Sequence, residues 1–462
     1  MIAEPKRPML ANNSILERYR CPEIFARLEL PARYQPGQGY FRFGSDVLAY
    51  GRTSMGHSSA SSGSEAFDAL SNSSADRTPI ALPFDPSEVA GNLRFERYAA
   101  NGAGSRWKAI QRKIYYGIRP LLGVNVRKHL QRRALRAWRD IPFPQWPVDR
   151  TVDKMFEKIL SFSMKAHGVT KVPFIWFWPD GQQSCAVMTH DVEELAGVHL
   201  CKQLMDMNDA HGIKSAFQLI PEKRYVLPAG FREELRRRGF EVNVHDLNHD
   251  GHLFEDEAEF QRRARKINGH VKEYEAKGFR AGMLYRNLDW MQSLSVSYDM
   301  TVPNVGHLDP QRGGCCTIFP YFAGDLLEIP LTTIQDYSLL HVLHDCTTEI
   351  WKTQLEIITQ HHGLASFNVH PDYINSREAR DLYERLLTLI AEYRSEGKLF
   401  VALPGEVDRW WRDRSRMVLV EDGDRWKIEG PQSERAQVAF ACADGEVLRY
   451  EFPTAESCIS YA

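Results

Sequence analysis

The sequence contains no uninterrupted apolar run of about 18 residues, the length that a helix needs to cross a membrane, so we expect no transmembrane segment. The N-terminus, MIAEPKRPMLANNSILERYR, lacks the apolar stretch of a secretory signal. The eight cysteines form no CxxC pair and follow no regular spacing, which in a chain of 462 residues predicts reduced thiols rather than a disulfide framework. Together these absences predict a cytoplasmic protein.

An excess of charge of one sign is also missing. The chain carries 58 Lys and Arg against 60 Asp and Glu, so we expect no general affinity for nucleic acid. One stretch, 106–140, is locally basic, with eleven Lys or Arg and one Asp in a helical apolar rhythm. Such a segment can lie on a membrane surface, but Pro120 and Gly123 interrupt the pattern and favour a scaffold helix instead. Nothing in the sequence indicates an oligomeric state.

Three zones of the chain differ in pattern. Residues 1–150 are irregular, with strand-like runs at YFRFGSDVLAYG and NLRFERYAA (92–100). They also include 53–78, rich in Ser, Ala and Gly, whose composition predicts a flexible insert. At the other end, 416–462 contains strand-like runs broken by EDGD and ADG, which predict a small antiparallel β unit.

The middle zone, 151–415, alternates strand and helix signals. Short β-like runs are followed by amphipathic segments of helical length, such as the helix expected at 255–278. The expected strands are 184–191, 214–220, 240–245, 278–282, 326–331, 365–370 and 399–403. Strands separated by helices of this length predict an α/β fold with a mainly parallel sheet, either open or closed into a barrel.

Polar residues suited to metal binding and acid–base chemistry lie where these strands end. The first cluster is the turn THDVE (189–193), and the second is the pair His245 and His249. Arg280 ends the next strand, and His370 ends a late one. In parallel α/β folds, ligands and catalytic groups gather at the carboxyl ends of the strands. We therefore expect these four clusters to form one site.

The chemistry of such a site follows from the residue types. Two histidines four apart on a helical turn direct their imidazoles at one point, a frequent arrangement for a divalent metal. Asp191 and Glu193 lie two residues apart, so one can supply a third ligand while the other accepts a proton from an attacking water. Arg280 can keep a carboxylate ionised, and His370 can donate a proton to a leaving group.

Each cluster taken alone also has a structural explanation. The THDVE turn can cap a helix, Arg280 can form a surface salt bridge, and Trp290 can belong to the core. The other histidines of this zone are expected to have structural roles: His190, His252, His341, His344, His361 and His362. Four polar clusters at the strand ends of one domain nevertheless favour a site over coincidence.

The ordered set Thr-x-Asp, His-x-x-x-His, Arg and a late strand ending in His resembles the NodB-homology polysaccharide deacetylases, over roughly residues 180–410. The resemblance implies a distorted, incomplete (β/α) barrel and a divalent metal, with zinc expected, that removes N- or O-acetyl groups from sugars. It implies that Asp191 is the catalytic base and that Arg280 orients it. It also implies that His245 and His249 bind the metal and that His370 is the general acid.

The chain departs from the family pattern at three places. Val192 follows Asp191 where a second aspartate is usual, which makes Glu193 the expected third metal ligand, as in relatives with Asp-x-Glu. Asp246 stands where Ser or Thr is common, and the segment after Arg280 lacks the usual proline. The stretch IPLTTIQDY resembles one found in bacterial members, so Asp336 is expected to line the cleft.

Three further expectations follow from the resemblance. The substrate is a carbohydrate, and Tyr285, Trp290 and Tyr373 are candidate faces for stacking on a sugar ring. Metal-free amidases that resemble allantoinases share the barrel, but the presence of both His245 and His249 argues against that branch. A non-catalytic glycan-binding module or an inactive deacetylase relative is the other alternative.

Overall fold

A computed structural model describes positions 13–453, apart from 57, 58, 60, 61, 63–65, 101–132, 134, 136, 424 and 446. The chain divides into two compact units, which are Met1–Arg94 with Thr151–Gly181 and Arg412–Ala462, and Phe95–Arg150 with Gln182–Trp411. The candidate residues of the sequence all fall in the second unit. None of the helices in the described ranges is both long and apolar enough to cross a membrane.

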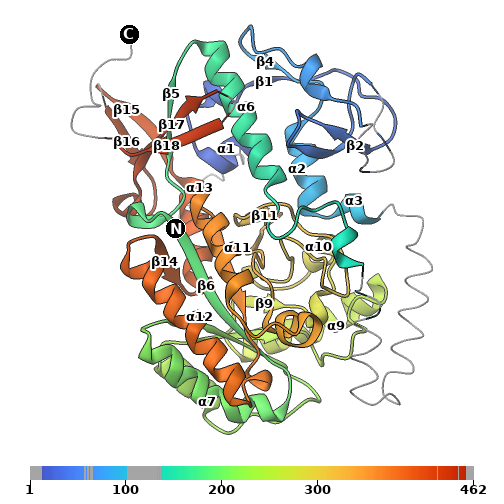
Figure 1. Cartoon of the computed structure of the whole chain (residues 1–462), viewed down its shortest axis with the longest axis vertical. Helices are drawn as coiled ribbons and strands as arrows, with labels where there is room; N and C mark the ends of the chain where they lie inside the picture. The colour runs from blue at the N-terminus through green and yellow to red at the C-terminus, as the bar shows by residue number, and fades with distance from the viewer. Residues whose placement is uncertain are drawn as a thin grey trace, which may run out of the picture. The chain divides into compact units, whose positions relative to one another are not determined.

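The second unit is built on one nine-stranded sheet (Figure 1). Its strands are β6 (Ser184–Val192), β7 (Ala216–Leu219), β8 (Glu241–His245), β9 (Gly278–Arg280), β10 (Tyr298–Asp299), β11 (Tyr321–Ala323), β12 (Leu326–Glu328), β13 (Leu364–Asn368) and β14 (Leu399–Ala402). They follow the order β11-β12-β10-β9-β8-β7-β6-β13, and β14 also pairs with β6. Every pair is parallel except β11 with β12.

The sheet does not close on itself within the described residues, because β11 pairs only with β12. The expected α/β fold with an incomplete, mainly parallel barrel is therefore confirmed. The long strand β6 lies next to β13 at one end of this order, and its residues 185–187 pair with β13 on one edge and with β14 on the other. All nine residues of β6 are buried, which agrees with a parallel strand covered on both faces.

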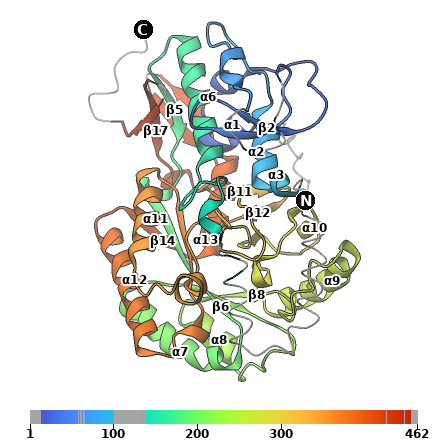
Figure 2. The ribbon, with the colours of Figure 1, turned by 45° about the vertical axis from the view of Figure 1, so that its right-hand side comes forward.

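Helices precede, connect and follow these strands along the chain. They are α3 (Arg97–Ala100), α7 (Leu195–Ala210), α8 (Phe231–Arg237), α9 (Glu257–Glu273), α10 (Leu288–Met291), α11 (Glu349–Gln360), α12 (Arg377–Ser395) and α13 (Pro404–Arg416), with short turns η4 (Trp138–Asp140), η6 (Gly282–Leu284), η7 (Ser338–Leu343) and η8 (Pro371–Tyr373). The helix α11 contacts β13, and α8 and α9 contact β8. The helix α12 contacts β14, beside which it lies in Figure 1 and Figure 2. Amphipathic spacing explains this cover. In α12, for example, Leu382, Leu386 and Ile390 are buried on one stripe, and the Ser376 side chain caps the first turn.

The first unit combines N-terminal and C-terminal elements. It contains α1 (Ser14–Tyr19), η1 (Glu23–Ala26), β1 (Leu28–Glu29), β2 (Gly39–Arg42), β3 (Leu48–Gly51), η2 (Ala69–Asn72), β4 (Ile80–Ala81), α2 (Pro86–Arg94), α6 (Thr151–His167), β5 (Lys171–Ile175), η5 (Pro179–Gly181), β15 (Val418–Asp422), β16 (Arg425–Glu429), η9 (Ser433–Arg435), β17 (Val438–Asp444) and β18 (Val447–Glu451). The strands β15 and β16 pair antiparallel, as do β17 and β18, which agrees with the antiparallel pairing expected for this part of the chain. The strand β5, from the zone expected to form the barrel, pairs with β17. The three-zone division of the chain stays a prediction.

The N-terminal run 92–100 differs from its prediction, and two other N-terminal segments lie partly outside the described residues. The strand-like run 92–100 is helical, because it falls on the end of α2 and on α3. In α2, Val89 and Leu93 lie four residues apart and are both buried, so helical burial prevails over the apparent strand character. The basic segment 106–140 lies largely outside the described residues, as does part of the predicted insert 53–78.

Candidate active site

The carboxyl ends of four strands bring the predicted residues together. Asp191 lies near the end of β6 and Glu193 follows it, while His245 ends β8. Arg280 ends β9 in register with His245. His370 follows β13, two residues after its end. Since β8, β9 and β13 are neighbours or near neighbours of β6 and all run the same way, their ends meet at one edge of the sheet.

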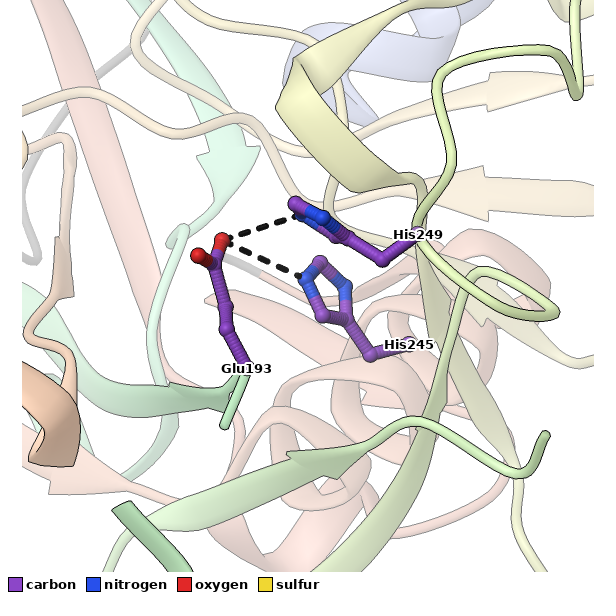
Figure 3. A group of neighbouring side chains, drawn as sticks. All are labelled: Glu193, His245 and His249. Carbon is purple, nitrogen blue, oxygen red and sulfur yellow. Dashed lines mark ion pairs between the residues drawn. The ribbon is translucent and has the colours of Figure 1, made fainter. Parts of the chain in front are cut away.

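Glu193, His245 and His249 form the core of the site, and Figure 3 shows the carboxylate facing both imidazoles. The Glu193 Oε1 atom lies 3.0 Å from His249 Nε2 and 4.0 Å from His245 Nε2. One ligand atom from each residue lies within 4.8 Å of the other two. Apart from these carboxylate contacts, both buried Nε2 atoms have no hydrogen-bond partner, which is costly unless another group satisfies them. This donor set suits a divalent metal such as Zn²⁺.

The turn that carries the two histidines is not the helical turn expected from their spacing. Residues 246–249 form no helix, and Asp246 and His249 have φ values of 54° and 53°. The Asp246 carboxylate accepts hydrogen bonds from the backbone N–H groups of Leu247 and Gly282, which fix this left-handed path. A tight irregular turn therefore brings the imidazoles together, their ring centroids 5.0 Å apart.

Backbone and side-chain partners orient the two rings. His245 Nδ1 lies 3.0 Å from the carbonyl oxygen of Arg280, which can only accept a hydrogen bond, so this contact leaves the Nε2 lone pair facing the site. The Arg224 Nη2 group lies 3.2 Å from His249 Nδ1 and donates to the His249 carbonyl at 3.0 Å. Burial alone would lower the pKa of His249, but the adjacent Glu193 carboxylate raises it above the usual value.

Asp191 is a buried carboxylate held at both oxygens. Arg280, which is fully buried, donates from Nη1 to Asp191 Oδ1 at 2.9 Å and to Thr189 Oγ1 at 2.8 Å. Asn368 Nδ2 donates to Asp191 Oδ2 at 2.8 Å. Burial would raise the pKa of Asp191, yet nearby charge, foremost that of the Arg280 guanidinium, lowers it to about 2. The group is therefore an anion that can accept a proton.

His370 faces the same space with the opposite charge. Its Nδ1 lies 2.6 Å from Asp336 Oδ1, and its backbone N–H donates to Asp336 Oδ2 at 2.8 Å. Its Nε2 lies 3.7 Å from Glu193 Oε1 and 3.8 Å from Asp191 Oδ2. Burial would lower the pKa of His370, but Asp336 and the two other carboxylates raise it to about 10. The imidazolium can donate a proton.

The predicted sugar-stacking residues lie in different surroundings. Tyr373 is half-buried, with its ring centroid 5.0 Å from that of His370. Trp290 is also half-buried and stacks on Phe254, with centroids 6.3 Å apart and an 11° angle between the planes. Tyr285 is buried, with 6% of its surface exposed. The structure thus brings Tyr373 to the site residues, while Trp290 packs in an aromatic cluster.

Four contributors to the site received no role from the sequence. Thr189 and Asn368 hold Arg280 and Asp191, and Arg224 contacts His249. Asp372 accepts three backbone N–H groups of the turn that carries Glu193. A buried strand that contains an asparagine, FNVH, was a signal for one of them. Thr189 lies on β6 within the THDVE motif, whereas Arg224 and Asp372 lie outside the strands, where sequence pattern does not indicate which side chains meet.

The chain matches no protein-family model, and no curated protein is significantly similar to it. Several solved structures are similar to about half of its length. A Mycobacterium smegmatis protein assigned as a polysaccharide deacetylase is 16% identical, over 52% of this chain and 93% of that chain, with a TM-score of 0.39. A Pseudomonas aeruginosa PAO1 protein with the same assignment is 15% identical (51% and 93% covered, TM-score 0.40). The allantoinase Puue is 12% identical (51% and 92% covered, TM-score 0.40).

Proposed function

We propose that the chain is a metal-dependent hydrolase that removes acetyl groups from an N- or O-acetylated sugar or polysaccharide. The observation that carries the proposal is the meeting, at one sheet edge, of three metal-ligating side chains with an anionic Asp191 and a protonated His370. The motif order, which resembles that of the NodB-homology deacetylases, supports the same reaction. A cytoplasmic location stays a prediction.

The residues present fit a divalent metal, with zinc the expected ion. Glu193, His245 and His249 would hold it, because their ligand atoms converge and, apart from the contacts with the Glu193 carboxylate, both buried imidazole Nε2 atoms lack a hydrogen bond. A bound metal supplies Lewis acidity, which polarises the acetyl carbonyl and makes water a nucleophile near neutral pH.

The side chains of the protein carry the proton transfers. Asp191, kept anionic by Arg280, accepts a proton from the attacking water. His370, kept charged by Asp336, gives a proton to the departing amine or alcohol. The Asp191 Oδ2 and His370 Nε2 atoms are 3.8 Å apart, so both groups reach one reacting centre. One carboxylate and one imidazolium thus supply a base and an acid for a single hydrolysis.

The substrate contact supported best is Tyr373. Its half-buried ring lies beside His370, where an aromatic face can pack on the C–H face of a sugar. Tyr285 and Trp290 stay candidates for the same role. We propose that the substrate is a carbohydrate on these grounds.

The test combines metal analysis with an acetate-release assay on N- and O-acetylated sugars. We expect bound metal and acetate release in the wild type, loss of metal and activity in His245→Ala, and loss of activity with metal retained in Asp191→Asn. His252→Ala is the matched control, because His252 lies on the same loop but pairs with Glu255. A wild type that binds glycan without releasing acetate would instead be a non-catalytic module. Activity that survives chelation and both variants would identify a metal-free amidase.

A further inference from the structure

Two side-chain amides connect Asp191 to a distant carboxylate, Asp309. Asn368 uses both hydrogens of its amide nitrogen, donating to Asp191 Oδ2 at 2.8 Å and to Gln335 Oε1 at 3.1 Å. Gln335 Nε2 in turn donates to Asp309 Oδ1 at 3.2 Å. The chain of contacts thus runs from Asp191 through Asn368 and Gln335 to Asp309, joining residues on β6, on β13 and in two loops.

The two carboxylates at the ends of this series of hydrogen bonds determine the direction of each bond in the series. An ionised carboxylate can only accept, so Asp309 requires the N–H end of the Gln335 amide. The carbonyl end of Gln335 must then face Asn368, and that oxygen requires an N–H group of Asn368. Asn368 therefore presents its second N–H, and not its carbonyl oxygen, to Asp191. Burial raises the pKa of Asp309 to about 6, against the opposing charge of Arg286, so the group is an anion above neutral pH.

An amide without such a constraint can turn over, because its two ends have nearly the same shape. A reversed Asn368 would place a carbonyl oxygen against Asp191 Oδ2 and repel that carboxylate. Arg280 would still hold Oδ1, but one contact fixes a carboxylate plane less well than two. The side chain that accepts the proton would then be misplaced, and misplacement of a reacting group by about 1 Å can cost roughly 100-fold in rate.

We propose that Asn368, Gln335 and Asp309 form a relay of positioning residues that holds an N–H group against the second oxygen of Asp191. The inference rests on the proposed function, in which Asp191 is the base. It assigns Gln335 and Asp309 to the reaction although neither contacts the reacting atoms. Because Asp191 is not one of the three metal ligands, the relay predicts an effect on turnover with no effect on metal binding.

The experiment compares the full chain, loaded with zinc at about pH 8, as wild type, Asn368→Leu, Asp309→Asn and the double variant. We expect Asn368→Leu to lower kcat on the order of 30-fold and Asp309→Asn to lower it about 3- to 10-fold, with KM and the zinc Kd within about 2-fold of wild type. The double variant should be no slower than Asn368→Leu, because Asp309 acts only through Asn368. Asn243→Leu is the matched control, a buried amide on β8 whose nitrogen donates to Glu241 and Tyr298.

Three results would overturn the relay. They are an additive loss in the double variant, a zinc Kd that weakens in step with kcat, and a control that slows as much as Asn368→Leu. If the wild type releases no acetate, the proposed function fails and the relay is judged on thermal unfolding. The double variant should then lose less Tm than the sum of the losses in Asn368→Leu and Asp309→Asn. A Tm loss in the double variant equal to that sum would overturn the relay.

Discussion

The carboxylate of Asp372 fastens the turn that presents Glu193 to the site. Its Oδ2 accepts the backbone N–H of Glu193 at 2.9 Å, and its Oδ1 accepts those of Glu194 and Gly197 at 3.0 Å each. Hydrogen bonds to a charged group contribute about 1.5–3 kcal/mol each when buried. Because Asp372 is half-exposed and water can replace part of this set, we expect Asp372→Ala to lower the free energy of unfolding by about 2–3 kcal/mol in total.

The Asp372→Ala substitution should also weaken metal binding. A ligand whose supporting contacts are removed typically loses about 10- to 100-fold in metal affinity, and we expect that range for zinc in Asp372→Ala. Asp372→Asn separates the two effects. Its carbonyl oxygen can still accept from Glu194 and Gly197, but its amide nitrogen faces the N–H of Glu193. We therefore expect nearly the full loss of zinc affinity with a smaller loss of stability.

The assay is zinc competition against a chromophoric chelator, with urea unfolding on the same samples. Gly197→Ala should mimic Asp372→Ala, because the new Cβ would lie 2.5 Å from Asp372 Oδ2, although Ala for Gly usually stabilises a helix. Asp256→Ala is the control, since it removes the cap of α9 and should cost about 1 kcal/mol of stability without any change in zinc affinity. Unchanged zinc affinity in both Asp372 variants, or an equal loss in the control, would refute the reasoning.

Three other predictions concern separate parts of the second unit. Burial raises the pKa of Glu241 from 4.5 to about 7, so the folded state binds this proton more tightly than the unfolded chain and loses stability as the pH rises through this range. Wild type should therefore lose about 3 kcal/mol more of its free energy of unfolding than Glu241→Gln between about pH 5 and about pH 8, as measured by urea unfolding. An equal pH dependence of stability in the two proteins would contradict the prediction. In Gly282→Ala the new Cβ would lie 2.7 Å from His249 Cδ2, so we expect zinc to bind at least about 10-fold more weakly, and an unchanged Kd would show that the ring can move aside. Tyr373→Leu should raise KM for an acetylated sugar about 5-fold while Tyr373→Phe does not, whereas equal effects would assign the contact to the hydroxyl group.

The sequence predicted the parts of this protein that depend on local pattern. Alternating strand and helix signals in 151–415 indicated the parallel sheet, because hydrophobic periodicity reflects which face of each element is buried. The positions of Glu193, His245 and His370 at strand ends followed from the same pattern. Local pattern was wrong at 92–100, where a run with strand character lies on helices α2 and α3, since burial of one helical stripe decided the conformation.

Local geometry within a loop was harder to predict. The spacing of His245 and His249 suggested a helical turn, but the structure has a left-handed turn fixed by the Asp246 carboxylate. Both turns direct the two imidazoles at one point, so the ligand prediction does not depend on this error. A hydrogen bond from a side chain to the backbone of a loop leaves little trace in residue periodicity.

The sequence by itself determined that carboxylates, imidazoles and a guanidinium stand at the ends of strands in one α/β domain. Only the tertiary structure decided how they are held, because those contacts join distant residues. Asn368 reaches Asp191 across 177 positions, and Gln335 reaches Asp309 across 26. Such contacts depend on strand order and on loop paths, which the folded core sets as a whole. Residue type and spacing carry the chemistry, whereas packing fixes the direction of each hydrogen bond.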